Sequence, residues 1–190
     1  IAPTESQRPG KGTREEKALT EIYEFYSARG RHKFELLASK IVESIVSGNG
    51  GYYREGWVTQ GSSDGGVDFV GSLRIGAGFS SVEVVVLGQA KCEDPAKVTS
   101  GNSLARTVAR LKRGWIGAYV TTSSFSERAQ LEIIEDSYPL LRVNGLTLAA
   151  ETLKLAERRG HSTLRSLLLA LEDEYQSSVR VRRPEDMLEI

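Results

Sequence analysis

Cysteine and histidine are scarce in this sequence. Cys92 is the single cysteine, so no disulfide can form within the chain, and this count suits a reducing cytoplasm. Only two histidines are present, His32 and His161. Zinc sites built from cysteine and histidine, and nuclease mechanisms that depend on histidine, therefore lack the residues that they need. We expect a cytoplasmic protein whose chemistry does not depend on thiols or imidazoles.

Long apolar runs and an excess of charge of one sign are also missing. No run approaches the roughly 20 residues of a membrane helix, and no signal peptide is visible, so we expect no membrane association. The chain has 25 basic and 25 acidic residues, so binding of nucleic acid would have to depend on where the charges lie. A nucleotide-binding Walker loop is missing too, because no Lys-Ser/Thr follows Gly76-Ala77-Gly78.

Length and composition predict one domain with a short addition at each end. Of the 190 residues, 39% are hydrophobic and 26% are charged, which is ordinary for a globular protein. Residues 1–12 are rich in proline and glycine and are predicted to be a flexible lead-in. We assign 13–160 to the main domain and 161–190 to a C-terminal helical extension. The chain begins at Ile1 rather than Met, and we expect a fragment or a processed product of a longer protein.

Hydrophobic periodicity predicts an alternation of helices and strands. A helix is expected to begin at Thr13, and the spacing of Ser124 and Glu127 is that of a capping box for a later helix that ends near Asp136. The other helices are predicted over 33–46, 103–114, 145–158 and 163–177, and the strands over 56–60, 67–70, 82–91, 115–122 and 140–143. This order indicates an α/β fold with a mixed central sheet flanked by helices, antiparallel at its beginning.

The clearest candidates for chemistry are Asp68, Gln89 and Lys91. Gln89 and Lys91 end the most apolar predicted strand, and side chains alternate across a strand, so the two face one side roughly 7 Å apart. A neighbouring strand that carries Asp68 would bring its carboxylate to the same side. Such oxygens beside an ammonium suit Mg²⁺ and the attack of metal-activated water on a phosphodiester, with Lys91 positioning the water or offsetting charge. The structural alternative is that Asp68 caps a turn and Lys91 extends from a sheet end.

These motifs occur in the order of a known family. Asp68 is followed 21 positions later by Gln89-Ala90-Lys91 at a strand end, which resembles the Mrr-like branch of the PD-(D/E)XK nucleases, where Gln often replaces the usual acidic residue. The stretch Ser63–Asp68 is similar to the glycine-rich approach to the catalytic Asp of that branch. Ala118–Ser123 and Val143–Gly145 resemble its later strands, although Asn144 stands where the family commonly has Asp.

The resemblance covers roughly residues 30–155 and implies a fold, an activity and a set of site residues. The fold is a restriction-endonuclease-like core, with residues 13–160 as the endonuclease catalytic domain. The activity is Mg²⁺-dependent hydrolysis of DNA, as in the cleavage domain of a restriction enzyme, with dependence on DNA modification left open. The catalytic residues are Asp68, Gln89, Lys91 and Glu35, of which Asp68 and Gln89 would bind the metal. Glu35 is included in this set because Phe34-Glu35 matches the family's helix that often contributes a further acidic residue.

A local excess of positive charge follows the predicted strand 82–91. Between residues 95 and 130 the only acidic residue is Glu127, against six basic ones, Lys97, Arg106, Arg110, Lys112, Arg113 and Arg128. We expect Arg106, Arg110 and Arg113 on one face of the predicted helix 103–114, where with Lys97 they would bind DNA phosphates. The alternative is an ordinary solvated helix face.

Other functions and partners stay open. A Holliday-junction or repair nuclease would share this core, and a catalytically silent domain could bind nucleic acid through the basic helix. Besides DNA, the expected partners are a recognition domain or subunit outside this chain and a second copy of the chain. The predicted helix 163–177 bears on this last point, because its leucine stripe could either pack on the core or pair two subunits.

Overall fold

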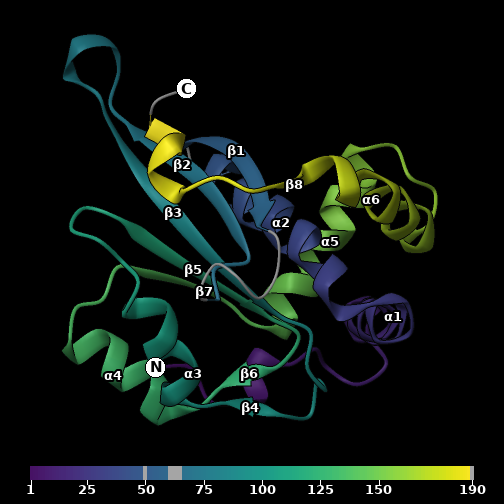
Figure 1. Cartoon of the computed structure of the whole chain (residues 1–190). Coiled ribbons are helices and arrows are strands. Elements are labelled where there is room, and N and C mark those ends of the chain that lie inside the picture. Colours follow the sequence, from purple (N-terminus) through teal and green to yellow (C-terminus); the bar gives the residue numbers. More distant parts are fainter. Residues whose placement is uncertain (49–50, 60–65, 189–190) are drawn as a thin grey trace.

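The computed structural model describes residues 1–48, 51–59 and 66–188. Its centre is a six-stranded sheet in the order β7-β5-β3-β2-β1-β8 (Figure 1). The strands are β1 (Tyr52–Thr59), β2 (Phe69–Ile75), β3 (Val82–Lys91), β5 (Ile116–Thr121), β7 (Leu140–Val143) and β8 (Val179–Arg180). β1, β2 and β3 pair antiparallel, while β3, β5 and β7 pair parallel. The predicted mixed sheet with an antiparallel beginning is confirmed.

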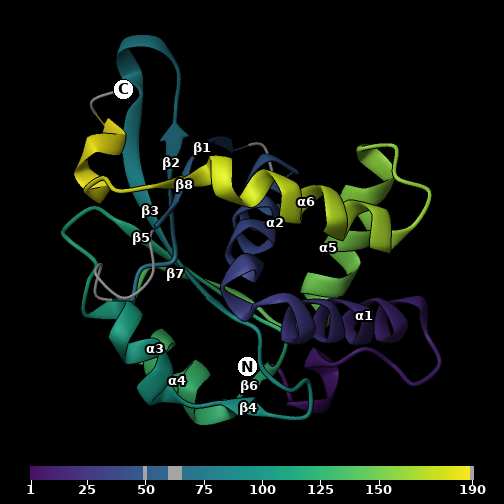
Figure 2. The ribbon, with the colours of Figure 1, turned by 45° about the vertical axis from the view of Figure 1, so that its right-hand side comes forward.

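Helices cover both sides of this sheet, as Figures 1 and 2 show. One side carries α1 (Arg14–Arg29), α2 (Phe34–Gly48), α5 (Gly145–Arg158) and α6 (Leu164–Ser178). The other carries α3 (Gly101–Val108), α4 (Glu127–Glu135) and the short 3-10 helix η4 (Pro184–Leu188). Near α3 and α4 a small parallel pair is formed by β4 (Val98–Thr99) and β6 (Ser124–Phe125). The expected α/β fold with a flanked sheet is confirmed.

Strand β3 shows why the two sides form separate cores. Its side chains alternate, so Val86 and Ala90 join the large core beneath α2 and α5. Val85 and Leu87 face the opposite side and pack in a smaller cluster with Met187 of η4. The same alternation carries Gln89 and Lys91 onto the side of α3 and η4.

Gly88 brings β2 and β3 together without a side chain between them. The ring of Phe69, its cross-strand partner, fills the space next to Gly88, and a Cβ built there would lie 2.0 Å from the ring. A larger residue would push the strands apart. Glycine at this position therefore fixes the separation of the strands one residue before Gln89.

The helix predicted over 103–114 is wrong in its bounds, because α3 spans Gly101–Val108. After Val108 the chain tightens into a turn in which the N–H of Leu111 donates to the Val108 carbonyl at 3.0 Å. Leu111 then packs against the cluster around Trp115 instead of continuing the stripe of Leu104 and Val108. Burial in a second cluster thus outweighs the helical periodicity.

The predicted capping box at Ser124 and Glu127 is also wrong. The N-cap of α4 is Ser126, whose side chain accepts a hydrogen bond from the backbone N–H of Ala129. Ser124 belongs to β6, where it stands opposite Val98, so it is not available to begin the helix.

The strand bounds differ from the predictions mainly at β1 and β2. β1 begins at Tyr52 rather than Gly56, and Gln60, its predicted end, lies outside the described residues. β2 begins at Phe69 and continues to Ile75, because its whole length pairs with β3 in a long hairpin (Figure 1). The predicted strand over 67–70 includes only the apolar beginning of β2 and misses the residues up to Ile75.

Both ends of the chain make specific contacts. In the expected flexible lead-in, Gln7 is buried, and its side chain donates to the Phe125 carbonyl at 2.9 Å and accepts from the Phe125 N–H at 2.8 Å. In the expected C-terminal extension, Leu167, Leu168 and Leu171 of α6 are buried in the large core. The division at residues 12 and 160 stays a prediction. None of the helices in the described part of the chain has the length and apolar character needed to cross a membrane.

Candidate active site

The sheet brings Asp68, Gln89 and Lys91 together. The N–H of Asp68 donates to the Gly88 carbonyl at 2.8 Å, just before the pairing of Phe69 with Gly88 begins β2. Gln89 and Lys91 are two residues apart on β3 and face one side of the sheet. The carboxylate of Asp68 lies against the backbone between them, because its Oδ2 accepts a hydrogen bond from the N–H of Ala90. The expected proximity of the three side chains is therefore present, although their roles stay predictions.

The carboxylate of Asp68 is held by the backbone of β3. Its Oδ2 accepts a hydrogen bond from the N–H of Ala90 at 2.7 Å, and no described residue donates to Oδ1. Burial raises the pKa of Asp68, while this hydrogen bond and the charges of Lys91 and Arg110 oppose the rise. One oxygen of the carboxylate is thus fixed and the other is available to a ligand.

Glu35, in the first turn of α2, lies close enough to Asp68 and Lys91 for their charges to act on its pKa. Burial raises the pKa of Glu35 to about 8, and the charge of Asp68 is the second cause of the rise. Lys91 and a hydrogen bond from the hydroxyl of Tyr175 to Glu35 Oε2, at 3.3 Å, act in the opposite direction. Two carboxyl groups that repel each other in a buried setting share the site with one ammonium group, which is an arrangement that a cation would stabilise.

Gln89 is buried and oriented by α3. Its Oε1 accepts a hydrogen bond from the hydroxyl of Thr107 at 2.6 Å. An amide oxygen has two lone pairs, so one remains for a second donor or a metal. Helix α3, which follows β3 in the chain, therefore fixes the side chain of Gln89.

The donor set of the site consists of hard oxygens, which suit Mg²⁺. Asp68 and Glu35 provide carboxylates and Gln89 provides an amide oxygen. Among the residues that the structure describes, no group of three or more His, Cys, Asp or Glu side chains is arranged to hold a metal. A cation here would therefore complete its coordination with water or with the substrate.

Of the predicted DNA-binding residues, Arg110 is the one whose charge lowers the pKa of Asp68. Its guanidinium covers Gly66, which has a φ of 90°, and a Cβ at Gly66 would lie 3.1 Å from Arg110 Nη1. Arg106 is exposed on α3, and its carbonyl accepts from Arg110 Nη1 at 2.9 Å. The expectation that Arg106, Arg110 and Arg113 share one helix face is wrong, because α3 ends before Arg110 and Arg113. Arg113 is exposed in the following turn, and Lys97 is exposed just before β4.

Two residues near the site were not predicted. Thr107 lay within a predicted helix, and nothing in its spacing connected it with Gln89. Tyr175 is 140 positions from Glu35 and lies on α6, in a segment predicted only as a helical extension. Among the secondary candidates, Asn144 caps α5 through a 2.9 Å hydrogen bond from the Thr147 N–H.

The remaining acidic candidates lie elsewhere. Glu83 pairs with Arg54 and Arg74 at 3.3 Å, far from the end of β3. Cys92, the single cysteine, is buried in the large core. Asp64, in the glycine-rich stretch before Asp68, lies outside the described residues.

Comparison with known proteins connects this geometry to a family. A family model described as restriction endonuclease, Mrr_cat, matches residues 30–151. The chain is similar to the solved structure of the MspJI restriction endonuclease in complex with a 27-mer oligonucleotide, with 44% sequence identity and a TM-score of 0.94 over 100% of this chain and 42% of that one. No curated protein sequence matches.

A second solved structure, the DNA modification-dependent restriction endonuclease AspBHI, shares the fold. Its TM-score is 0.75 at 21% identity, over 92% of this chain and 43% of that one. The chain thus spans less than half the length of either protein. Because the family model covers more than half of the chain, and because a 44% identical structure matches all of it, the chain belongs to the Mrr-like restriction endonuclease family.

Proposed function

We propose that this chain is the DNA-cleaving domain of a modification-dependent restriction enzyme and that it hydrolyses phosphodiester bonds with Mg²⁺ as cofactor. The observation that carries the proposal is the convergence of Asp68, Glu35, Gln89 and Lys91 at one end of β3, in a chain of a restriction endonuclease family. The oligonucleotide in the complex of MspJI supports DNA as the substrate.

Each side chain of the site has a role that its environment suits. Bound Mg²⁺ would supply Lewis-acid activation of water and of the scissile phosphate. Asp68, fixed through Oδ2, and the Gln89 amide, fixed by α3, would hold the cation together with Glu35. Lys91 faces the same side, where its ammonium positions the attacking water and offsets negative charge at the phosphate. Burial makes these interactions stronger than they would be in water.

DNA would be held by the basic residues that follow β3. The charge of Arg110 acts on Asp68, and Arg106, Arg113 and Lys97 extend the positive charge on exposed segments. If these residues contact phosphates, each loss of charge should lower the log–log salt slope of binding by about 0.9. Sequence preference should not change, because phosphate contacts carry no direct sequence information.

A cleavage assay tests the proposal. The parent protein is incubated with methylated and unmethylated plasmid, with Mg²⁺ or with a chelator. Asp68→Asn and Lys91→Met should abolish cleavage while folding and DNA binding persist. The matched control is Asp173→Asn, an exposed carboxylate on α6, which should cut like the wild type. Substantial metal-dependent cleavage by a well-folded Asp68→Asn variant would contradict the assignment of the site.

The alternatives give different outcomes in the same assay. A junction or repair nuclease would prefer branched or damaged DNA over both plasmids. A silent domain would bind DNA and cut neither substrate. The proposal also includes a recognition part outside this chain, since the chain spans only 42% of the MspJI chain. We place the protein in the cytoplasm. Double-strand cleavage would need a second active site or sequential nicking, so a homodimer belongs to the proposal as well.

A further inference from the structure

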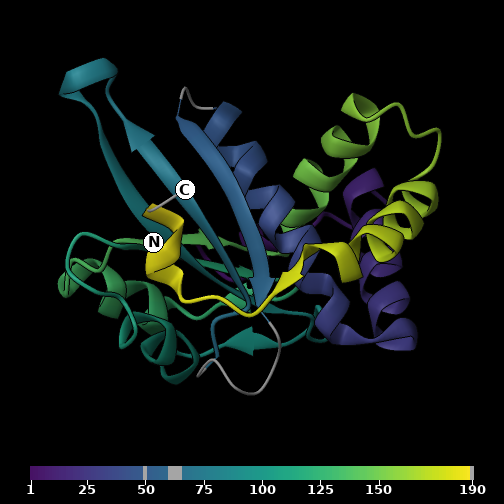
Figure 3. The same cartoon turned by 45° about the horizontal axis from the view of Figure 1, so that its top comes forward.

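The last described residues form a segment fixed to the edge of the sheet. We call residues 179–188 the C-terminal strap. It begins as β8, in which Val179 and Arg180 pair parallel with Val58 and Thr59 of β1. It then crosses the end of β1 and closes into η4, where Met187 is buried (Figure 3). This segment lies outside residues 30–151, which the family model matches.

Three further contacts hold the strap in place. Glu185 forms an ion pair with Lys112, which lies in the turn after α3. Arg54 Nη2 of β1 donates to the Met187 carbonyl at 2.7 Å. Met187 packs between Trp57 and the apolar residues of β2 and β3. The strap is therefore a fixed part of the surface.

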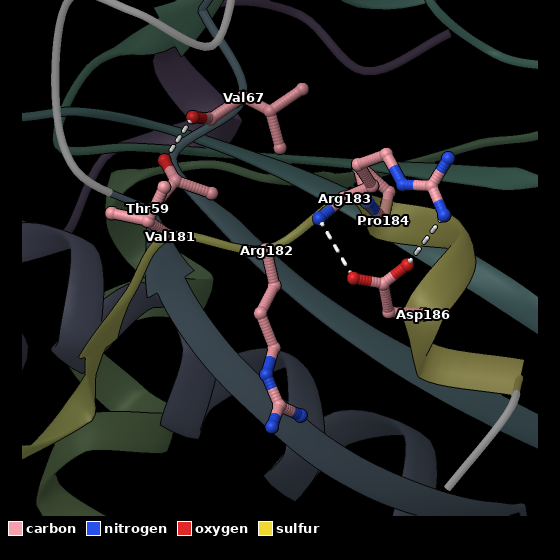
Figure 4. Close-up of a pocket in the computed structure, with 7 residues that line it drawn as sticks. All are labelled: Thr59, Val67, Val181, Arg182, Arg183, Pro184 and Asp186. Atoms are coloured by element: carbon pink, nitrogen blue, oxygen red, sulfur yellow. Dashed lines mark hydrogen bonds and ion pairs between the residues drawn. The ribbon is translucent and has the colours of Figure 1, made fainter.

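The strap passes close to Asp68. Thr59, the partner of Arg180, donates its N–H to the Asp68 carbonyl at 3.0 Å, so Arg180 and Asp68 lie on either side of β1. With neighbouring strands about 4.8 Å apart, the Cα atoms of Arg180 and Asp68 are roughly 10 Å apart. A cavity of about 370 Å³ lies along this route. Figure 4 shows its lining, Thr59, Val67, Val181, Arg182, Arg183, Pro184 and Asp186.

The strap carries positive charge that the described part of the protein does not neutralise. Arg180, Arg182 and Arg183 are all exposed. Arg183 pairs with Asp186 at 3.3 Å, but no described carboxylate pairs with Arg180 or Arg182. The guanidinium of Arg182 lies 5.9 Å from the centre of the Trp57 ring, a cation–π contact that limits its freedom. Two arginines without acidic partners, one of them oriented, are suited to an anionic ligand.

We propose that Arg180 and Arg182 of the strap bind backbone phosphates of the DNA strand, on the side of Asp68 opposite to Arg110. Arg110 covers Gly66 from the side of α3, whereas the strap runs along β1. Cations would thus flank the carboxylates on both sides. Because the Cα atoms of Arg180 and Asp68 are only roughly 10 Å apart, the bound phosphate would lie within a few nucleotides of the scissile one. This inference rests on the proposed function, because it assumes that DNA crosses Asp68.

Binding of the parent protein to duplex DNA tests the strap. Affinity is measured over a series of salt concentrations in chelator, so that no cleavage occurs. The double variant Arg180→Gln/Arg182→Gln should lower the log–log salt slope by about 1.8, at about 0.9 per lost contact. The double variant Arg180→Lys/Arg182→Lys keeps both charges and should restore most of the slope. The matched control, Arg14→Gln/Arg165→Gln, removes two exposed arginines of α1 and α6 and should leave the slope unchanged.

A second measurement locates the contact. Single phosphates of the DNA are replaced by neutral methylphosphonates at successive positions. In the wild type, one or two positions within a few nucleotides of the cut should each weaken binding, and in the glutamine variant this penalty should vanish at those positions alone.

The outcomes separate the inference from the proposed function. An unchanged slope and an unchanged phosphate profile in the glutamine variant, with normal cleavage by the wild type, would overturn the role of the strap and leave the proposed function intact. Equal loss of binding in the lysine and glutamine variants would show a structural role of the strap, which also overturns the inference. A wild type that neither binds nor cuts DNA would overturn both.

Discussion

Replacing Glu35 by glutamine should remove a pH-dependent loss of stability that the site imposes on the protein without metal. Below the ordinary pKa of 4.5, Glu35 is protonated in both the folded and the unfolded chain. Between 4.5 and about 8 the unfolded chain ionises while the folded chain keeps the proton. The folded state then binds more protons than the unfolded state, so stability falls as the pH rises. Above about 8 both states are ionised and the loss levels off.

The size of this loss follows from the rise in pKa. Each unit corresponds to about 1.4 kcal/mol, so a rise from 4.5 to about 8 sets a ceiling of roughly 5 kcal/mol. A domain is stabilised by only about 5–15 kcal/mol, so even half of that loss is easy to measure. Glutamine keeps the shape of Glu35 and can accept the hydrogen bond of Tyr175. It cannot ionise, and the loss should disappear.

Urea unfolding in chelator, at half-unit steps from pH 5 to pH 9, measures the effect. The difference in unfolding free energy between Glu35→Gln and the wild type should grow across this range in favour of the variant. An Asp68→Asn protein that keeps Glu35 should lose less stability between pH 5 and pH 9 than the wild type does, because the charge of Asp68 is the second cause of the raised pKa of Glu35. As a control, Glu21→Gln, a residue of α1 outside the site, should follow the wild type at every pH. A constant difference between Glu35→Gln and the wild type would refute the reasoning.

Three other predictions concern the surroundings of the site. Gln89→Glu keeps the acceptor for Thr107 and adds a charge beside the metal position, so calorimetry should show tighter Mg²⁺ binding by the free protein, with cleavage retained in part. Tyr175→Phe removes the hydrogen bond that lowers the pKa of Glu35, so the pH range over which cleavage rises should move upward, with little change in melting temperature. Leu168→Ala should cost about 2–5 kcal/mol of unfolding free energy at every protein concentration, because this leucine is buried within one chain. A cost that depends on concentration would instead indicate a dimer through α6.

Much of the fold could be predicted because it follows from local patterns. The alternation of Val85, Val86 and Leu87 between two cores, for example, is the period of a buried strand. The same two-residue alternation predicted that Gln89 and Lys91 face one side of the sheet. The errors arose where tertiary packing outweighs local pattern. Leu111 continues a helical stripe in the sequence, yet it packs with Trp115, and the helix ends before it.

The candidate site was predictable only where its residues share a strand or a recognisable motif. Thr107 and Tyr175 carry no such pattern, because each meets its partner through the packing of a whole helix. The basic strap was missed for a related reason. Its residues fall within the predicted C-terminal helical extension, and only pairing with β1 places Arg180 close to Asp68.

The hydrogen bond between Tyr175 and Glu35 has a consequence for the order of events during synthesis. A ribosome adds roughly 5–20 residues per second, and 140 positions separate these two residues, so α2 emerges many seconds before α6. During that interval Glu35 has no partner from α6, and the strap next to Asp68 does not yet exist. Strands β2 and β3 can pair early, but the surroundings of Asp68 and Glu35 are complete only when the later part of the chain has docked. Contacts of such long separation in the sequence make the completed candidate site a late product of folding.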